Sequence, residues 1–279
     1  MTDTGIVALL DGTLLDPTAP LLRGDDLGVL RGEGVFETTL VVDGRPRDLD
    51  EHLARLSRSA RLTGVEVPGP DRWRTGVAAV VGAWTGASEM VLRLVASGGP
   101  DGGSPVCYLL GSGLPAVSRR QRRDGVRVLL LDRGFTVASG SAAPWLLAGA
   151  KTLSYGINMA ALRYARANGA DDVIFVGADG AVLEAPTSSV VVARGRTLVT
   201  PPEDAILAGI TVRRLFRAAA DAGWQVRTEP VTPADLTTAD GVWLASSARL
   251  LAPVVAIDGR PRPDGGSTAE LAALLQTPA

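Results

Sequence analysis

The sequence predicts a mixed α/β fold divided into two lobes. Short β-rich runs alternate with amphipathic helical runs along the chain, and the strands outnumber the helices. At 279 residues the chain is long enough for one large domain or for two of ordinary size. Residues 113–125 are rich in glycine, proline, serine and arginine, which is typical of an interdomain linker. We therefore expect a smaller N-terminal α/β domain over residues 1–112 and a larger C-terminal domain over residues 126–279.

The first half is predicted to contain short strands, two tight turns and two helices. The expected strands are residues 6–10, 35–42, 90–96 and 106–110, and the expected helices are residues 48–62 and 71–84. Asp-Gly pairs at residues 11–12 and 43–44 follow the first two strands and favour hairpin turns. Leu49, Leu53 and Leu56 recur at helical spacing in the first helix, and its acidic start suits the helix dipole.

The second half is predicted to alternate strands with two further helices. The expected strands are residues 126–131, 173–176, 187–193, 242–245 and 254–257 with one more near Val226, and the expected helices are residues 157–168 and 210–222. Val212, Leu215 and Ala219 recur at helical spacing in the last of these helices. Both helices stop at a glycine, Gly169 and Gly223, as helices commonly do.

Composition excludes several classes of partner. The net charge of −2 predicts no general attraction to nucleic acid or to an anionic membrane. Residues 119–123 (RRQRR) could contact RNA, but the overall acidity favours a solvated connector. No apolar stretch approaches the roughly 18–20 residues of a membrane span, and the first residues lack the basic start of a secretory signal. We therefore expect a cytoplasmic protein without a nucleic-acid or membrane partner.

The chain has one cysteine and one histidine, Cys107 and His52, which excludes several chemistries. These two residues cannot build a His/Cys zinc site, so we expect no metal site. Cys107 lies in an expected strand, where an inert buried thiol is favoured, and a lone cysteine fits a reducing compartment. His52 lies in an expected helix without any nucleophile-elbow motif in the chain, which argues against a serine–histidine triad. Residues 32–34 (GEG) are too short for a dinucleotide fingerprint.

Lysine is almost absent from the chain. Lys151 is the single lysine, against 27 arginines. Arginine carries charge equally well but cannot form an imine, whereas a partly desolvated lysine amine can. Residues 145–150 and 152–155 are largely apolar or small, which favours a buried reactive amine over a solvated cation. A chance remnant of an arginine-rich composition is the alternative, so Lys151 needs support from other residues.

A lysine that holds pyridoxal phosphate as an imine makes three demands on the rest of the chain. The ring nitrogen needs an acid, the phosphate needs an arginine and the free amides of a helix start, and the substrate needs its own anion site. Segments in the right order meet these demands, namely residues 32–37 (GEGVFE), 51–56 (EHLARL), 151–155 (KTLSY) with Asn158, 183–189 (LEAPTSS) and 207–211 (LAGIT). With these segments the chain resembles the fold-type IV pyridoxal-phosphate enzymes, which include branched-chain and D-amino-acid aminotransferases and aminodeoxychorismate lyase.

The resemblance covers nearly the whole chain and implies the two-lobed fold of D-amino-acid aminotransferases, with Lys151 in the C-terminal domain. Lys151 would hold the cofactor and then serve as the general base, Glu184 would pair with the ring nitrogen, and Arg55 would contact the phosphate. Without the resemblance, Glu184 could be a surface turn residue and Arg55 a solvated helix residue. For His52 we favour a helix-start hydrogen bond over proton transfer, because Lys151 already supplies the base.

Four further residues are expected at the cofactor. Ile210 and Thr211 open a helix whose free amides and dipole favour the phosphate, although Thr211 could simply be an N-cap. Ser247 suits another phosphate contact. Tyr155 either steers the cofactor ring or packs against its neighbours.

Phe36, Arg93 and Arg249 are the expected substrate residues. The resemblance places Arg93 on a substrate-facing strand as a carboxylate ligand, with a structural strand arginine as the alternative. Arg249 adds a cation near the cofactor loop, and two arginines suit a dicarboxylate such as 4-amino-4-deoxychorismate. D-Amino-acid aminotransferases carry an arginine and a histidine where this chain has Ser97 and Gly99, which argues against a simple D-amino-acid role.

The residues and the resemblance together predict an enzyme that acts on a small amino substrate. The favoured reaction is that of 4-amino-4-deoxychorismate lyase, which forms 4-aminobenzoate and pyruvate for folate synthesis. The alternative is an aminotransferase that uses branched-chain or D-amino acids with a 2-oxo acid acceptor. A relic of the fold without activity is a third reading, which the intact Lys151, Glu184 and Arg55 oppose. The family also implies a homodimer.

Overall fold

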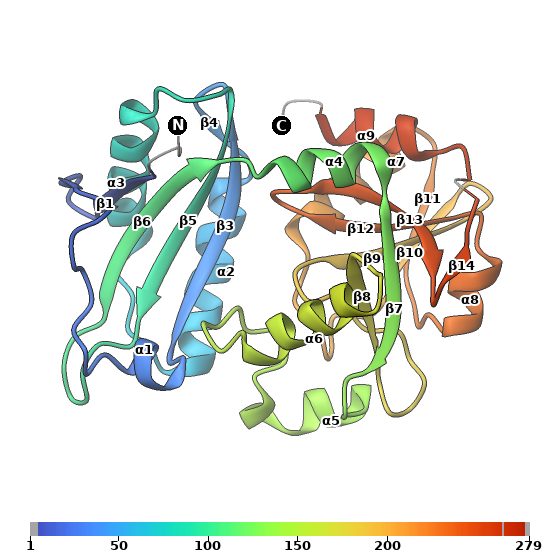
Figure 1. Ribbon diagram of the computed structural model, residues 1–279, viewed down its shortest axis with the longest axis horizontal. Helices are drawn as coiled ribbons and strands as arrows, with labels where there is room; N and C mark the ends of the chain where they lie inside the picture. Colours follow the sequence, from blue (N-terminus) through green and yellow to red (C-terminus); the bar gives the residue numbers. More distant parts are fainter. Residues whose placement is uncertain (1–4, 264, 277–279) are drawn as a thin grey trace. The chain divides into compact units, whose positions relative to one another are not determined.

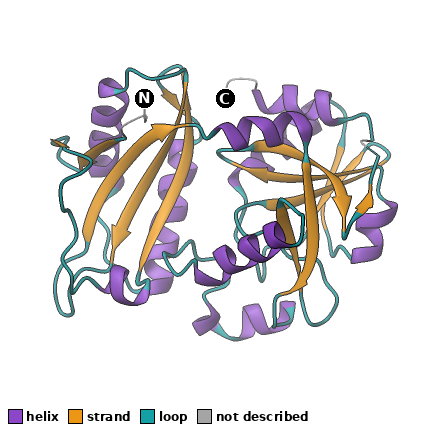
Figure 2. Ribbon diagram, viewed as in Figure 1, coloured by secondary structure: helices purple, strands orange, loops and turns teal. Residues whose placement is uncertain are grey.

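The computed structural model describes residues 5–263 and 265–276 and confirms the mixed α/β fold (Figures 1 and 2). The chain forms two compact units. Unit 1 comprises the described residues up to Pro115 together with Ala150–Tyr155. Unit 2 comprises Ala116–Gly149 and the described residues from Gly156 onward.

This division differs from the expected one in two respects. The expected linker, residues 113–125, is not an irregular connector, because most of it is the helix α4 (Ala116–Asp124) of unit 2. Lys151 was expected in the C-terminal domain, but its segment packs with unit 1. The reason is backbone pairing to a strand of unit 1, which sequence position alone does not reveal.

Unit 1 is built on an antiparallel sheet with the strand order β2-β1-β6-β5-β3-β4. Its strands are β1 (Ile6–Leu9), β2 (Leu14–Leu15), β3 (Gly34–Val42), β4 (Arg45–Pro46), β5 (Glu89–Ser97) and β6 (Val106–Gly113). Both expected hairpin turns are present, because β1 pairs with β2 and β3 pairs with β4. Asp43 and Gly44 have φ values of 49° and 73°, so both central residues of the second turn adopt the left-handed conformation that such hairpins require.

Two helices cover one face of this sheet. They are α2 (Leu49–Thr63) and α3 (Pro70–Ala83), and the short α1 (Leu27–Arg31) precedes β3. Met90, Leu92 and Leu94 of β5 are buried in the core that these helices complete with Leu56 and Trp73. Alternate residues of a strand point to opposite faces, so the intervening residues of β5 face away from the two helices.

Unit 2 is built on a larger mixed sheet with the strand order β11-β10-β9-β12-β13-β7-β8, and β14 pairs with β13. Its strands are β7 (Val126–Asp132), β8 (Asp172–Val176), β9 (Ser189–Arg194), β10 (Thr197–Thr200), β11 (Gln225–Thr228), β12 (Gly241–Ser246), β13 (Leu250–Ile257) and β14 (Arg260–Pro261). Besides α4, its helices are α5 (Val137–Ala142), the 3₁₀ turn η1 (Pro144–Leu146), α6 (Gly156–Ala167), α7 (Ile210–Asp221), α8 (Pro233–Thr238) and α9 (Thr268–Gln276).

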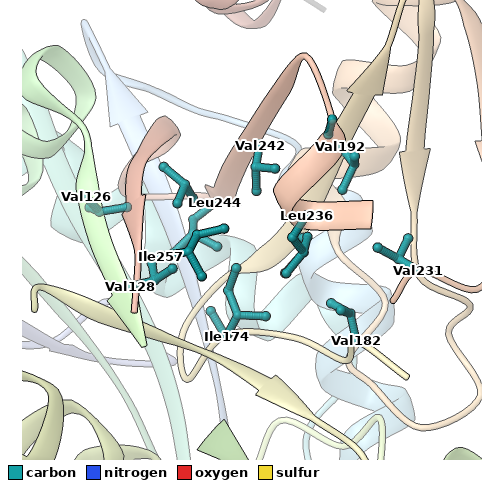
Figure 3. Close-up of a cluster of buried hydrophobic side chains, with 14 of the residues drawn as sticks. Val126, Val128, Ile174, Val182, Val192, Val231, Leu236, Val242, Leu244 and Ile257 are labelled. Atoms are coloured by element: carbon teal, nitrogen blue, oxygen red, sulfur yellow. The ribbon is translucent and has the colours of Figure 1, made fainter. Parts of the chain in front are cut away.

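Both faces of the unit 2 sheet are buried. Val190 and Val192 of β9 belong to the cluster of aliphatic side chains drawn in Figure 3, together with Leu244 of β12. The intervening Val191 and Ala193 pack instead into the core beneath α7 and α9. A strand buried on both faces reads as a continuous apolar run, which is why residues 189–193 could be predicted as a strand. None of the described helices is both long and apolar enough to cross a membrane.

Candidate active site

The Lys151 segment runs along β3 as an additional short strand. Thr152 pairs with Val35, the Lys151 carbonyl accepts a hydrogen bond from Phe36 N at 3.1 Å, and the Gly34 carbonyl accepts one from Leu153 N at 2.9 Å. A Cβ on Gly34 would lie 2.5 Å from the Leu153 side chain and 2.6 Å from the Ala96 carbonyl. Glycine at this position therefore allows the segment to lie against the sheet.

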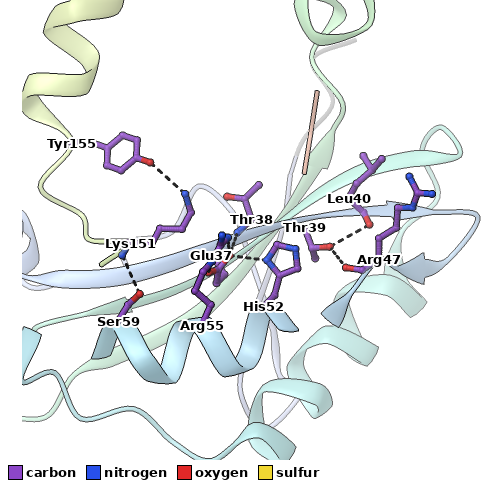
Figure 4. Close-up of polar contacts among 10 residues, drawn as sticks. All are labelled: Glu37, Thr38, Thr39, Leu40, Arg47, His52, Arg55, Ser59, Lys151 and Tyr155. Carbon is purple, nitrogen blue, oxygen red and sulfur yellow. Dashed lines mark hydrogen bonds and ion pairs between the residues drawn. The ribbon is translucent and has the colours of Figure 1, made fainter. Parts of the chain in front are cut away.

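Aromatic rings surround the Lys151 amine. The Nζ atom donates a hydrogen bond to Tyr155 Oη at 3.3 Å (Figure 4). It also lies 4.4 Å from the centroid of the Phe36 ring. The Phe36 and Tyr155 rings meet edge to face at 5.2 Å. None of the ion pairs found among the described residues of unit 1 includes Nζ. The amine is thus held in place without being neutralised.

A cavity of about 320 Å³ opens on the face of the unit 1 sheet that the two helices leave uncovered. It is lined by Leu22, Gly28, Val29, Phe36, Arg93, Val95, Ser97, Tyr108, Leu153 and Tyr155. Phe36 and Tyr155, which flank the Lys151 amine, are therefore also walls of this cavity. The strand register pairs Thr38 with Arg93 and Gly34 with Ser97, so Phe36 lies between Arg93 and Ser97 along the sheet.

Arg93 brings a cation to this cavity. Its Nη1 donates to Ser112 Oγ at 3.3 Å, and within unit 1 no described carboxylate forms an ion pair with it. Burial lowers the pKa of the Arg93 guanidinium, but arginine starts so high that the side chain stays protonated. The structure therefore brings together in unit 1 three expected residues, Phe36, Arg93 and Tyr155, around a cavity suited to an anionic group.

Ser97 lies in the same cavity wall and is fixed by Asp26, a residue that the sequence analysis did not select. The Ser97 hydroxyl donates to Asp26 Oδ1, which also accepts from Gly28 N at 2.8 Å. Asp26 is fully buried, and its Oδ2 has no hydrogen-bond partner among the described residues. Asp26 is also the N-cap of α1, and an aspartate directly before a helical run was the available signal for it.

Arg55 forms a buried ion pair with Glu37, the second residue that the sequence analysis left without a role. Arg55 Nε and Nη2 donate to the two Glu37 oxygens at 2.6 and 2.9 Å, and His52 Nδ1 lies 2.7 Å from Glu37 Oε2 (Figure 4). Burial raises the pKa of Glu37, but Arg55 and His52 lower it further, to well below the ordinary range. This contact gives the His52 side chain a structural partner in addition to the helix-start role expected of it. Glu37 shares the core-facing side of β3 with Val35, and that alternation was the signal for it.

The helix that carries Arg55 also holds the Lys151 backbone. Ser59 lies one turn after Arg55 on α2, so both residues face the same side of the helix. Ser59 Oγ accepts a hydrogen bond from Lys151 N at 3.0 Å. The buried face of α2 therefore places the Arg55 cluster and the Lys151 segment beside the same strand, β3.

In unit 2, Glu184 lies just before a tight turn that precedes β9. Its backbone carbonyl accepts from Phe175 N at 2.9 Å, and its Oε2 accepts from Leu207 N at 3.2 Å. The side chain is partly buried rather than placed on a solvated surface turn. Because Leu207 belongs to the loop that leads into α7, Glu184 is tied to the start of that helix.

Helix α7 begins where the sequence predicts a phosphate site. Gly209 is its N-cap and Ile210 its first residue, so Thr211 is inside the first turn and is not the cap. A Cβ on Gly209 would lie 2.4 Å from Ser189 Oγ and 3.3 Å from Ser189 Cβ, so a side chain at this position would require Ser189 to move. Free backbone amides at the start of a 12-residue helix suit an anionic group.

Arg249 does not have the setting expected of a substrate ligand. It lies in the turn between β12 and β13, is only 6 % exposed, and donates from Nη1 to Asp172 Oδ2 at 2.7 Å and from Nη2 to Ser188 Oγ. A guanidinium neutralised inside unit 2 would have to break this pair to reach a substrate, so the geometry opposes the expected role. Ser247, in the same turn, is partly buried.

The residues present fit pyridoxal phosphate. Unit 1 contains a primary amine against two aromatic rings. Unit 2 contains a partly buried carboxylate and a helix start with a glycine N-cap. Each has the chemistry that one part of the cofactor would need, namely an amine for its aldehyde, an acid for its ring nitrogen and an anion site for its phosphate. Among the described residues no cluster of histidine, cysteine, aspartate and glutamate suits a metal ion.

Comparisons with known proteins identify the family. The family description "Amino-transferase class IV" matches residues 34–257. A Mycobacterium tuberculosis protein named bifunctional aminodeoxychorismate lyase / D-amino acid transaminase is 46 % identical over 269 residues, which cover 92 % of this chain and 93 % of that protein. A solved structure of a hypothetical aminotransferase from Mycobacterium tuberculosis in its PLP-bound form has a TM-score of 0.94 and 46 % identity, with 97 % of each chain covered. A fold IV-transaminase from Curtobacterium pusillum has a TM-score of 0.93 and 38 % identity, with 98 % of this chain and all of that chain covered. The predicted family is confirmed: this chain is a fold-type IV member of the class IV amino-transferases.

Proposed function

We propose that this chain is a pyridoxal-phosphate enzyme in which Lys151 holds the cofactor. The observation that carries the proposal is the Lys151 amine, which lies against Phe36 and Tyr155 without a carboxylate partner among the described residues of unit 1. An amine kept free of an ion pair is available for covalent chemistry. The family match and the PLP-bound relative at 46 % identity support the same cofactor.

The remaining cofactor roles follow the resemblance. Glu184 is proposed to keep a proton at the ring nitrogen, and its contact with Leu207 N holds it in place for that role. Arg55, the backbone amides of Ile210 and Thr211, and Ser247 are proposed to bind the phosphate. The bidentate pair with Glu37 fixes the orientation of the Arg55 guanidinium before any ligand arrives.

The proton chemistry is assigned to Lys151. When bound, pyridoxal phosphate withdraws electrons from the substrate carbon that bears the amino group. The Lys151 amine then removes the proton of that carbon and holds it on Nζ. The hydrogen bond between Nζ and Tyr155 Oη orients the amine for this transfer, and Phe36 shields one side of it from water.

The proposed reaction is that of 4-amino-4-deoxychorismate lyase, which eliminates pyruvate and leaves 4-aminobenzoate for folate synthesis. The name of the Mycobacterium tuberculosis relative supports this activity. Arg93 is proposed to bind a substrate carboxylate, since this residue lines the cavity and no carboxylate in the described part of unit 1 neutralises it. Arg249 is engaged with Asp172 and is therefore not proposed as a second carboxylate ligand.

The second proposed activity is amino-group transfer between amino acids and 2-oxo acids. The name of the same relative joins a D-amino acid transaminase activity to the lyase activity. Both reactions begin with the same proton removal by Lys151, so one site can serve both. Ser97 and Gly99 are neither the arginine nor the histidine of the usual D-amino-acid carboxylate trap, which leaves Arg93 as the proposed carboxylate ligand.

One experiment separates the two activities. The purified protein with pyridoxal phosphate is incubated with 4-amino-4-deoxychorismate and, separately, with branched-chain or D-amino acids and 2-oxoglutarate. Pyruvate and 4-aminobenzoate from the first mixture support the lyase, and glutamate from the second supports the transaminase. If protein that has bound the cofactor forms neither product, both proposals are contradicted.

Assembly and location are also proposals. The family supports a homodimer working in the cytoplasm. Size-exclusion chromatography with light scattering is expected to give twice the mass of the chain. A monomer throughout the working concentration range would contradict the dimer.

A further inference from the structure

Arg249 joins several segments of unit 2 at one buried point. Its Nη1 contacts Asp172 at the start of β8 at 2.7 Å and Gln121 of α4 at 3.3 Å, and its Nη2 contacts the Ser188 hydroxyl. The side chains of Arg249 and Asp172 are 7 % and 3 % exposed. We define these four residues as the Arg249 cluster.

Two of the connected segments lead directly to expected cofactor contacts. Ser188 closes a turn in which Ala185 N donates to the Ser188 carbonyl at 2.8 Å, and this turn follows Glu184 immediately. Arg249 itself lies two residues after Ser247 in the turn that joins β12 to β13. The same guanidinium therefore ties the Glu184 turn to the Ser247 turn.

Helix α4 holds the Ser247 turn through hydrogen bonds to the backbone carbonyls of that turn. Arg122 donates from Nη2 to the Ala248 carbonyl at 2.7 Å and from Nε to the Arg249 carbonyl at 3.1 Å. The turn also includes Leu250 in the left-handed conformation with φ 57°, which a residue other than glycine adopts only under constraint. The arginine-rich segment expected to be a solvated connector thus restrains a turn of the site.

The energetics of buried ion pairs indicate that the Arg249 cluster fixes the positions of its members rather than adding stability. A buried ion pair gains little net stability, because desolvation of both charges offsets their attraction. Aliphatic side chains of similar volume would fill the same space at least as well. What they could not supply is a planar set of donors that holds a carboxylate and a hydroxyl at fixed positions simultaneously.

We propose that Arg249 is a positioning residue that sets the affinity for pyridoxal phosphate by fixing the turns that carry Glu184 and Ser247. The inference rests on the proposed function, since it takes these two residues as cofactor ligands. Lysine in place of Arg249 keeps the charge but cannot hold Asp172 and Ser188 together. Arg249→Lys is therefore expected to loosen both turns.

The test is a titration of the apo-protein with pyridoxal phosphate, read from the absorbance of the bound cofactor, for wild type, Arg249→Lys and Ser188→Ala. The matched control is Arg196→Lys, which breaks an exposed bidentate pair with Glu270 at 3.0 and 2.8 Å in the same unit. Arg249→Lys is expected to raise the dissociation constant about 10- to 100-fold, the range seen when a supporting residue is lost at metal sites. Arg196→Lys is expected to change it by less than about 2-fold, as for exposed pairs.

The outcomes separate positioning from simple stabilisation. All titrations are done well below the unfolding midpoint of the variant, so a shift in affinity reports on the site. If Arg249→Lys does not fold, Ser188→Ala decides, because it frees the Glu184 turn but leaves the ion pair with Asp172; a weaker affinity is again expected. If the folded variants bind pyridoxal phosphate as tightly as wild type does, the inference about Arg249 is overturned, whereas the proposed cofactor still stands. Wild-type protein that binds no pyridoxal phosphate would overturn the proposed function and this inference with it.

Discussion

The structure contains two kinds of cation, and they differ in whether a carboxylate neutralises them. Arg55 in unit 1 and Arg249 in unit 2 are buried and paired with Glu37 and Asp172. Arg93, which lines the cavity of unit 1, and Lys151, whose amine lies against the cavity residues Phe36 and Tyr155, are partly buried, and no described carboxylate of that unit pairs with them.

This difference separates cations that are open to a new anionic partner from cations that a carboxylate already holds. A neutralised guanidinium binds a further anion well only if its pair stays intact, because breaking the pair leaves a carboxylate buried and uncompensated, which is costly. The phosphate contact proposed for Arg55 is of this kind, with the Glu37 pair kept. A cation without a partner retains its attraction for an anion, or its reactivity in the case of an amine. The comparison predicts that changes at Lys151 and Arg93 alter chemistry more than stability. Changes to the partner of Arg55 should do the reverse.

Lys151→Arg gives the largest expected effect. Arginine keeps the charge and the contact with Phe36 but can neither hold the cofactor covalently nor remove the substrate proton. Turnover in the two assays should fall at least about 10³-fold, within the range of a lost general base, while the thermal midpoint changes little. Unchanged turnover in Lys151→Arg would show that Lys151 is not the reactive amine.

Glu37→Gln tests the role of a carboxylate that neutralises a buried cation. It leaves Arg55 buried without its carboxylate and should cost about 3 kcal/mol of unfolding free energy, measured in urea. The exposed pair of Asp50 with Arg74 provides the control, and Asp50→Asn should cost under about 1 kcal/mol. Equal losses in the two variants would contradict the assignment of Glu37 to a buried, organising pair.

The acid side of the stability curve sharpens the same test. The folded-state pKa of Glu37 is lowered, so its contribution is fully present above the unfolded-state pKa of about 4.3 and is lost as the pH falls through the folded value. The stability difference between wild type and Glu37→Gln should be constant above about pH 5 and narrow below about pH 4. If the difference in unfolding free energy between wild type and Glu37→Gln grows as the pH falls, the lowered pKa of Glu37 is contradicted.

Arg93→Met tests the cavity cation. Loss of a charge-assisted hydrogen bond to a carboxylate, worth roughly 1.5–3 kcal/mol, should raise KM about 10- to 100-fold with little change in the unfolding midpoint. Arg61→Met, at an exposed position of α2, is the control for the loss of a positive charge. Equal KM values for Arg93→Met and wild type would make Arg93 a structural strand arginine.

Tyr155→Phe has the smallest expected effect. It removes the hydroxyl that accepts from Lys151 Nζ but keeps the ring against Phe36. The loss of one hydrogen bond of about 1 kcal/mol should lower kcat about 5-fold and leave KM for the substrate nearly unchanged. A large loss of cofactor affinity instead would show that the ring, not the hydroxyl, had been displaced.

Local pattern explains why much of the fold could be predicted. β3 and β5 follow from runs of residues that favour strands, α2 and α7 from helical spacing, and the hairpin of β3 and β4 from its Asp-Gly turn. The helix α4 could not be found in this way. Most of its residues are polar, so it lacks an apolar periodicity. In the structure its Arg122 contacts a carbonyl 126 residues away in sequence, which no local pattern reveals.

The candidate site also contains residues that a local pattern reveals and residues that it does not. The segments with Lys151, Glu184 and Ile210 could be selected because each combines an unusual residue with a local element. The partners of Arg55 and Arg249 could not, because pairing depends on which helix covers which strand face. Arg249 shows the consequence, since a sequence cannot reveal that Asp172, 77 residues earlier, lies beside it.

The attachment of the cofactor to Lys151 is the central claim and can be measured directly. Purified protein is mixed with pyridoxal phosphate, reduced with borohydride, digested and analysed by mass spectrometry. We expect the phosphopyridoxyl group on the peptide that contains Lys151, together with loss of the absorbance of the bound cofactor. An unmodified Lys151 peptide from protein that had bound the cofactor would contradict the account.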